Sequence, residues 1–81
     1  MTHEEIKKKV LPIVAKYLCE EESTIDVNAD LRDEYGADSL DMTQIVMIVE
    51  KEFSIAIKDD AIDKMKTTQD IIDEVKRIVL D

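Results

Sequence analysis

The fold is decided by residues 38–53, DSLDMTQIVMIVEKEF, which have the pattern of one amphipathic helix. Asp38 is a residue type that caps helix N-termini, and Asp41 adds a second negative charge near the positive end of the helix dipole. Projected at about 100° per residue, one side is an apolar stripe suited to a core: Met42, Ile45, Val46, Val49 and Phe53. We therefore predict a helix that starts after Asp38 and runs to about Phe53.

The opposite, polar face of this predicted helix carries two apolar side chains, Leu40 and Met47. They lie beside polar or charged residues: Gln44, Glu50 and Lys51. An adaptable methionine framed by charge is typical of a docking patch, where apolar atoms supply contact area and charges supply orientation. Isolated apolar residues are also ordinary on surfaces, which is the alternative interpretation. Ile48 lies between the two faces and fits either.

Two further long helices are expected on either side of this one. Thr2 and Glu5 have the spacing of a capping box, and apolar residues at helical spacing follow, so we predict a helix over residues 3–18. Pro12 should bend or split it near residues 8–12, because proline lacks a backbone donor and crowds the preceding turn. Thr67 or Thr68 is expected to cap the last helix, whose apolar face consists of Ile71, Ile72, Val75, Ile78 and Val79.

The connections between these helices differ in length and character. Residues 19–38 show no sustained period, so we expect a long loop, held to the core by apolar anchors: Ile25, Val27, Leu31 and Tyr35. Residues 54–58 are expected to be a connector, and a short helix is predicted from Asp59 to about Met65. The predicted fold is all-α, a small antiparallel bundle of three long helices and one short helix that forms a single domain over residues 1–81.

The acidic residues are unevenly distributed. The 81-residue chain has a formal net charge of −9. Ten acidic residues and one base, Arg32, lie between Tyr17 and Glu50, and the rest of the chain is balanced. Such a field repels nucleic acid and anionic membranes and attracts partners with basic surfaces, although an acidic bias can also serve solubility alone. We expect basic protein partners, no nucleic acid and a monomeric protein.

Cysteine usage and hydropathy bear on the compartment. Cys19 is the only cysteine, so no internal disulfide is expected, as suits a reducing environment. The chain opens without a basic and apolar leader, and no apolar run approaches the length of a membrane span. A cytoplasmic location is therefore expected, with no integral membrane association.

Ser39 is placed at a helix start without the residues that would make it a nucleophile. The only histidine is His3 and the only cysteine is Cys19, so no catalytic set surrounds the hydroxyl. One histidine and one cysteine cannot form a zinc site, and Gly36 as sole glycine cannot build a phosphate-binding loop. We predict that the chain is not an enzyme and that Ser39 is acted upon by another protein.

Two acidic patterns in the chain have simpler explanations than chemistry. Residues 26–30 mimic the first ligands of a calcium loop, but Leu31 and Ala37 occupy the positions that require Gly and Glu, so no metal site is predicted. Asp38 and Asp41 have the spacing of an acid and base pair, yet helix capping accounts for both.

The sequence resembles the acyl carrier proteins, above all at Asp38, Ser39 and Leu40. The likeness extends from Asn28 to Ile72, and more loosely over the whole chain. Its pieces are Asn28-Ala29 before Leu31, the block 36–41 (GADSLD), Val46, Met47, Glu50, Glu52 and Phe53, and Ile57 with Asp59. A three-residue match alone would be a weak signal, whereas this combination is typical of the discrete carriers of fatty acid and type II polyketide synthesis.

The resemblance implies a modified serine. It implies that Ser39 accepts 4′-phosphopantetheine through a phosphodiester, that the terminal thiol carries acyl groups as thioesters, and that Asp38 assists the modifying phosphopantetheinyl transferase. It also implies that acyl-transfer and chain-elongation enzymes recognise one helix face, and that the core opens to shelter the acyl chain. The partner-binding residues expected on this basis are Leu40, Asp41, Gln44, Met47 and Glu50.

Several positions depart from the pattern of the family. Thr43 and Gln44 stand where a valine and a glutamate are usual, Lys58 replaces a frequent proline, and Pro12 is atypical. These departures leave open a carrier of aminoacyl or other acyl groups in a specialised pathway. The alternative from another class is an acidic helical adaptor that is never modified.

Overall fold

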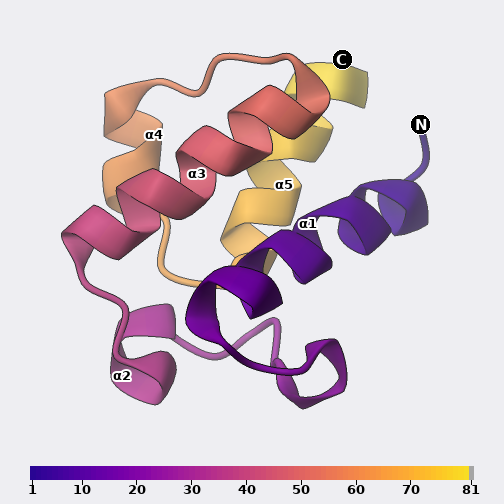
Figure 1. Cartoon of the computed structure of the whole chain (residues 1–81). Coiled ribbons are helices and arrows are strands. Elements are labelled where there is room, and N and C mark those ends of the chain that lie inside the picture. Colours follow the sequence, from indigo (N-terminus) through magenta and orange to yellow (C-terminus); the bar gives the residue numbers. More distant parts are fainter. Residues whose placement is uncertain (81) are drawn as a thin grey trace.

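The computed structural model describes residues 1–80 and shows a helical bundle (Figure 1). Its elements are α1 (His3–Leu18), a short 3-10 turn (Glu22–Thr24), α2 (Leu31–Tyr35), α3 (Ser39–Phe53), α4 (Asp59–Lys64) and α5 (Thr68–Leu80). Within residues 1–80 the only β-type pairing is one isolated bridge between Asp30 and Thr67. The predicted all-α fold is confirmed.

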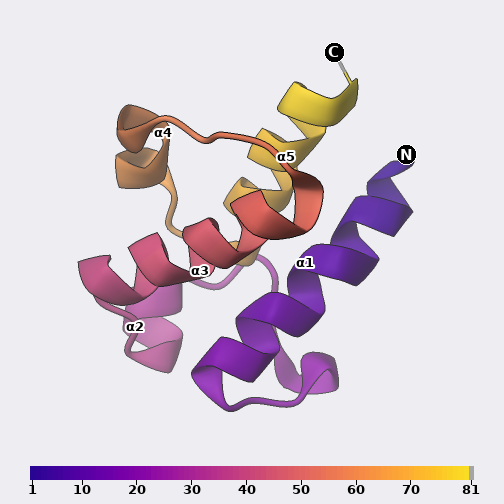
Figure 2. The ribbon, with the colours of Figure 1, turned by 45° about the horizontal axis from the view of Figure 1, so that its top comes forward.

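The three long helices surround one apolar core. Helix α1 packs against both α3 and α5, and in Figures 1 and 2 both of these helices run in the direction opposite to α1. Helices α3 and α5 share a direction because the connection through α4 returns the chain to the starting end. The core consists of Ile6, Val10, Val14, Leu31, Ala37, Met42, Ile45, Val46, Val49, Ile57, Met65, Ile71, Ile72 and Val75.

Helix α1 begins with the predicted capping box. Thr2 Oγ1 accepts from the Glu5 backbone N–H at 3.2 Å, and Glu5 Oε1 accepts from the Thr2 N–H at 2.9 Å. This hydrogen bond with the Thr2 backbone is the main reason that the pKa of Glu5 is lowered. The predicted split at Pro12 is wrong, because α1 is continuous from His3 to Leu18. Buried valines on both sides of the proline, Val10 and Val14, hold the helix to the core and offset the lost backbone donor.

The long loop expected over residues 19–38 contains α2, which the sequence reasoning did not identify. Asp30 Oδ1 caps this helix by accepting from the N–H groups of Arg32 and Asp33. Gly36 ends it in the left-handed region, with φ of 71°. A five-residue helix is too short to show an apolar period. The signals in the sequence were the two capping residues, Asp30 before the helix and Gly36 after it. The anchoring role predicted for Leu31 is confirmed, since its side chain is fully buried.

The start of α5 is capped by Thr67, which decides between the two predicted caps. Thr67 Oγ1 accepts from the Asp70 N–H at 3.0 Å, and Asp70 Oδ2 accepts from the Thr67 N–H at 3.1 Å. Thr68 instead lies wholly in the core, with 0% of its surface exposed. Its hydroxyl has no hydrogen-bond partner among residues 1–80.

Replacing Thr68 by valine is expected to stabilise the fold. Valine keeps the shape of the side chain and removes a buried hydroxyl without a partner, so the free energy of unfolding should rise by about 1 kcal/mol. Thr67→Val is the matched control, because it removes the helix cap and should lower the same quantity by about 1 kcal/mol. Urea unfolding midpoints of both variants measure the difference. A Thr68→Val protein less stable than the wild type would contradict the assignment.

Candidate functional site

Ser39 is the first residue of α3, and its side chain is exposed. The preceding residue, Asp38, has extended backbone angles, so the chain enters α3 abruptly after the turn at Gly36. Arg32, on α2, donates from Nη2 to Ser39 Oγ at 3.1 Å. The serine hydroxyl therefore lies at a helix end, open to solvent, with one cationic side chain in contact.

The two aspartates around Ser39 form the N-terminal cap of α3, as the sequence predicts. Asp38 Oδ1 accepts from the Asp41 N–H at 2.9 Å, and Asp41 Oδ2 accepts from the Asp38 N–H at 3.1 Å. The second oxygen of Asp41 accepts from the Tyr17 hydroxyl at 3.2 Å, which ties α3 to α1. Burial, followed by this hydrogen bond to Asp41, raises the pKa of Tyr17. The backbone that carries Ser39 is thus fixed by reciprocal caps and by a contact to α1.

Sequence reasoning did not single out Arg32 as a site residue. The signal was present, because Arg32 is the only base in a segment with ten acidic residues. Its contact with Ser39 depends on how α2 is placed against α3, which the sequence did not predict. Arg32 also lines a groove of about 280 Å³ beside the start of α3, together with Asp30, Ala37, Met42, Asp63, Met65 and Lys66.

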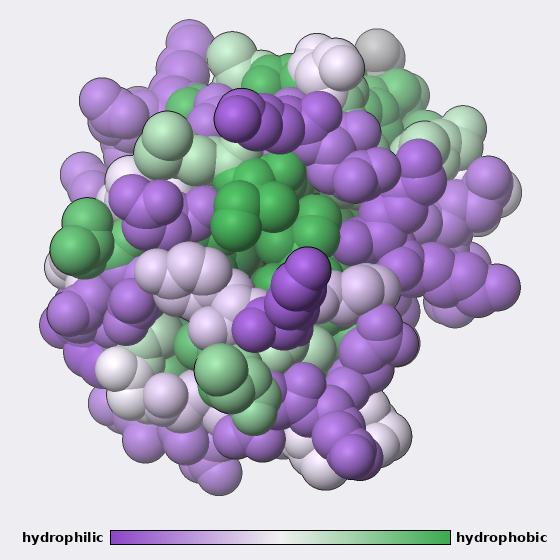
Figure 3. Space-filling model, in the orientation of Figure 1, coloured by the Kyte–Doolittle hydropathy of each residue, from purple (hydrophilic) through white to green (hydrophobic). Residues whose placement is uncertain are grey.

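The predicted docking face of α3 carries exposed apolar side chains. Leu40 is 66% exposed, Met47 is 49% exposed, and Ile48, which the sequence left open, is 42% exposed. Gln44 is also exposed and lies between Leu40 and Met47 at helical spacing. Figure 3 shows a hydrophobic area near the centre of the face on which α3 lies, bordered by hydrophilic residues. These three apolar residues, Leu40, Met47 and Ile48, are called the α3 patch below.

The other two residues predicted for partner binding, Asp41 and Glu50, have structural contacts. Asp41 completes the cap described above. Glu50 is only partly exposed, and its Oε2 accepts from the Ile57 N–H at 2.7 Å, which holds the connector to the end of α3. A substitution at Glu50 would therefore disturb the connector as well as the surface charge.

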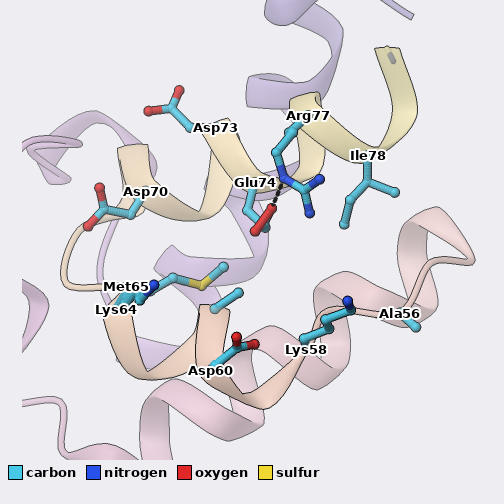
Figure 4. A pocket seen from close by; sticks show the side chains of 11 residues that line it. Ala56, Lys58, Asp60, Lys64, Met65, Asp70, Asp73, Glu74, Arg77 and Ile78 are labelled. Atoms are coloured by element: carbon cyan, nitrogen blue, oxygen red, sulfur yellow. Dashed lines mark hydrogen bonds and ion pairs between the residues drawn. The ribbon is translucent and has the colours of Figure 1, made fainter.

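A second groove, of about 500 Å³, lies between α4 and α5 (Figure 4). Charged side chains of both signs surround it, and Arg77 is paired with Glu74 there. Its lining residues include neither Ser39 nor any other residue predicted for the site. The residues predicted from the sequence therefore gather at the start and along the exposed face of α3, away from this groove.

Neither a cluster of metal-ligating side chains nor a helix of membrane-spanning length is found among residues 1–80. No group of three or more His, Cys, Asp or Glu side chains in residues 1–80 is arranged to hold a metal ion. None of the helices in that range is both long and apolar enough to cross a membrane.

Comparison with known protein families gives a match over most of the chain. The family described as "Phosphopantetheine attachment site" matches residues 8–75, a range that includes Ser39, α2, α3 and α4. The chain belongs to this phosphopantetheine-binding family. It is a non-catalytic carrier protein whose prosthetic group is 4′-phosphopantetheine. Carrier domains of this kind are modified by phosphopantetheinyl transferases and serve acyl-handling enzymes.

Proposed function

We propose that this carrier protein bears 4′-phosphopantetheine on Ser39 and presents acyl groups to the enzymes of fatty acid or polyketide-type synthesis. The observation that carries the proposal is the exposed Ser39 hydroxyl at the first residue of α3, inside the range matched by the family. The other serines are less suited: Ser23 lies in the 3-10 turn, and Ser54 ends α3 in a left-handed conformation.

The residues around Ser39 fit a phosphodiester. A phosphate on this oxygen would lie at the positive end of α3, where negative charge is favoured. The Arg32 guanidinium is already within hydrogen-bond distance of the same oxygen. When attached, the group supplies a terminal thiol that holds acyl cargo as a thioester. Its root must be open to partner enzymes, and the exposure of Ser39 provides this.

The cap of α3 suggests the role of Asp38 in this proposal. Asp38 fixes the backbone immediately before the serine, so the start of α3 is presented to a transferase in one conformation. Its side chain remains exposed at the surface. Partners with basic surfaces would be attracted by the acidic residues on either side of the site and would then contact the α3 patch.

Two alternatives differ in how the family match bears on them. An adaptor that is never modified is disfavoured, because the matched family is defined by an attachment site. A carrier of aminoacyl or other acyl groups in a specialised pathway has the same attachment chemistry, and Thr43 and Gln44 on α3 are the positions that favour it. The α3 patch and the acidic segment support the fatty acid or polyketide type.

Loading and cargo analysis together test the proposal. Incubation with coenzyme A and a broad-specificity phosphopantetheinyl transferase should add one phosphopantetheinyl group to the intact mass, and peptide mapping should place it on Ser39. Mild hydroxylamine treatment of protein isolated from its producing cells should cleave the thioester, releasing the acyl group as a hydroxamate and leaving the free thiol on the protein. An aminoacyl product would redirect the assignment to the second carrier type, and modification at a different residue would refute the proposed site.

Met47→Gln is expected to weaken recognition by partner enzymes without weakening the fold. Glutamine matches methionine in helix propensity, and the Met47 side chain is half exposed. The free energy of unfolding should therefore change by less than about 0.5 kcal/mol. Loss of an apolar anchor should lower kcat/KM of the transferase about five- to thirtyfold, equivalent to about 1–2 kcal/mol. Met47→Leu, which keeps an apolar surface, is the control. Equal kcat/KM values for the wild type, Met47→Gln and Met47→Leu would show that Met47 is not part of the docking face.

A further inference from the structure

Arg32 is the one basic residue in an acidic stretch of the sequence, although Lys66 lines the same groove beside the start of α3. It is the only base between Tyr17 and Glu50, and its Nη2 donates to Ser39 Oγ at 3.1 Å. The ion pairs within 4.0 Å among residues 1–80 join other residues, Lys9 with Glu52 and Arg77 with Glu74. The guanidinium charge is therefore not neutralised by a carboxylate at that distance, although acidic residues are abundant nearby.

The backbone of Arg32 is held firmly in place. Leu31, its neighbour, is fully buried and donates its N–H to the Lys66 carbonyl at 2.8 Å. Asp30 Oδ1 accepts from the Arg32 N–H at 2.9 Å, and the Arg32 carbonyl accepts from the Gly36 N–H at 3.0 Å. Helix α2 is thus fixed at both ends, and only the arginine side chain must adjust to a group on Ser39.

We propose that Arg32 is a positioning residue that binds the phosphate at the root of the prosthetic group and holds the arm on the α2 side of Ser39. The inference rests on the proposed attachment at Ser39 and adds a residue and a direction to it. A guanidinium that donates to the serine oxygen can donate to phosphate oxygens attached at the same atom. Such a bond is stronger than the guanidinium-to-hydroxyl contact that it replaces, because both partners are then charged.

Local charge favours this role. The carboxylates of Asp38 and Asp41 already lie at the start of α3, and a phosphodiester on Ser39 adds a third negative charge. Arg32 is the cation in direct contact with that oxygen. It also lines the groove of about 280 Å³ described above, so binding to Arg32 directs the root of the arm toward this groove and away from Leu40.

Phosphorus NMR of the loaded protein tests the proposal without any enzymatic readout. The proteins compared are the wild type, Arg32→Gln, Arg32→Lys and the control Lys51→Gln, which removes the same charge from an exposed position near the end of α3. Each is loaded, its added mass is verified, and its ³¹P resonance is followed from about 0.01 M to about 1 M NaCl. Over that range the screening length falls from about 30 Å to about 3 Å.

The wild-type ³¹P resonance should move as the salt concentration rises, because salt screens the attraction between Arg32 and the phosphate on Ser39. The resonance of Arg32→Gln should stay near the wild-type high-salt position at every salt concentration. The fraction of molecules in which side chain 32 binds the phosphate should fall about two- to fivefold at low salt, as for the loss of an exposed charge pair. Lys51→Gln should follow the wild type. Arg32→Lys should retain part of the salt response, because lysine supplies the charge without the planar fork.

The outcomes separate this proposal from the proposed function. Loaded Arg32→Gln with the same ³¹P position and salt response as the wild type would overturn the role of Arg32 and leave attachment at Ser39 intact. A wild-type protein that gains no phosphopantetheinyl mass on Ser39 would overturn both. Because Arg32 is exposed, its variants are expected to keep the wild-type fold, which amide spectra of the same samples verify.

Discussion

Ser39→Ala is expected to abolish loading completely, because alanine has no oxygen to accept the phosphopantetheinyl group. The intact mass after incubation with coenzyme A and transferase should remain that of the unmodified chain. The fold should be kept, since Ser39 is exposed and its side-chain oxygen supplies no cap to α3. We expect a change of no more than about 0.5 kcal/mol in the free energy of unfolding.

Ser23→Ala is the matched control for this experiment. Ser23 is also exposed, but it lies in the 3-10 turn rather than at the start of a long helix. It should load at the wild-type rate. If Ser39→Ala were loaded to the same extent as Ser23→Ala, the attachment residue would lie elsewhere, and the inference about Arg32 would fail with it.

Leu31→Ala should have the largest effect on stability. The side chain is fully buried and joins α2 to the core, so its truncation leaves a cavity and should cost about 2–5 kcal/mol. Domains of this size are stable by only about 5–15 kcal/mol, so the loss is a large fraction of the total. Denaturant unfolding followed by circular dichroism measures it.

Leu40→Ala provides the same chemical change on the surface. Leu40 is 66% exposed, and its truncation should alter the free energy of unfolding by no more than about 0.5 kcal/mol. Similar unfolding midpoints for the two alanine variants would show that α2 is not held by the core contact of Leu31. The Leu31→Ala protein should also release Arg32 from Ser39, which the loss of the salt-dependent ³¹P shift would reveal.

The long helices could be predicted from the sequence because each has an N-terminal capping residue, Thr2, Asp38 or Thr67, and a sustained apolar period. Helix α3 has Asp38 before it and core residues at helical spacing within it, and it runs from Ser39 to Phe53 as expected. Helix α2 has only five residues, fewer than two turns, which is too short for a repeating apolar pattern to be recognised. The split at Pro12 was wrongly predicted because local propensity does not include the packing of the valines around it.

The candidate site was only partly predictable for a related reason. Ser39 and its two aspartates are adjacent in sequence, so local rules of helix capping placed them. The contacts made by Arg32 with Ser39 and by Glu50 with Ile57 each join different elements across seven residues. They depend on the path of the chain between those elements, which composition and spacing do not determine.

The cap around Ser39 has a consequence for how far cargo can travel. The turn at Gly36 and the reciprocal bonds of Asp38 and Asp41 leave the serine backbone almost no freedom of its own. With the arm rooted there, the volume swept by a thioester is a sphere centred on a stationary point, with a radius equal to the length of the arm. A partner enzyme must therefore bring its reacting atoms inside that sphere by its choice of docking pose.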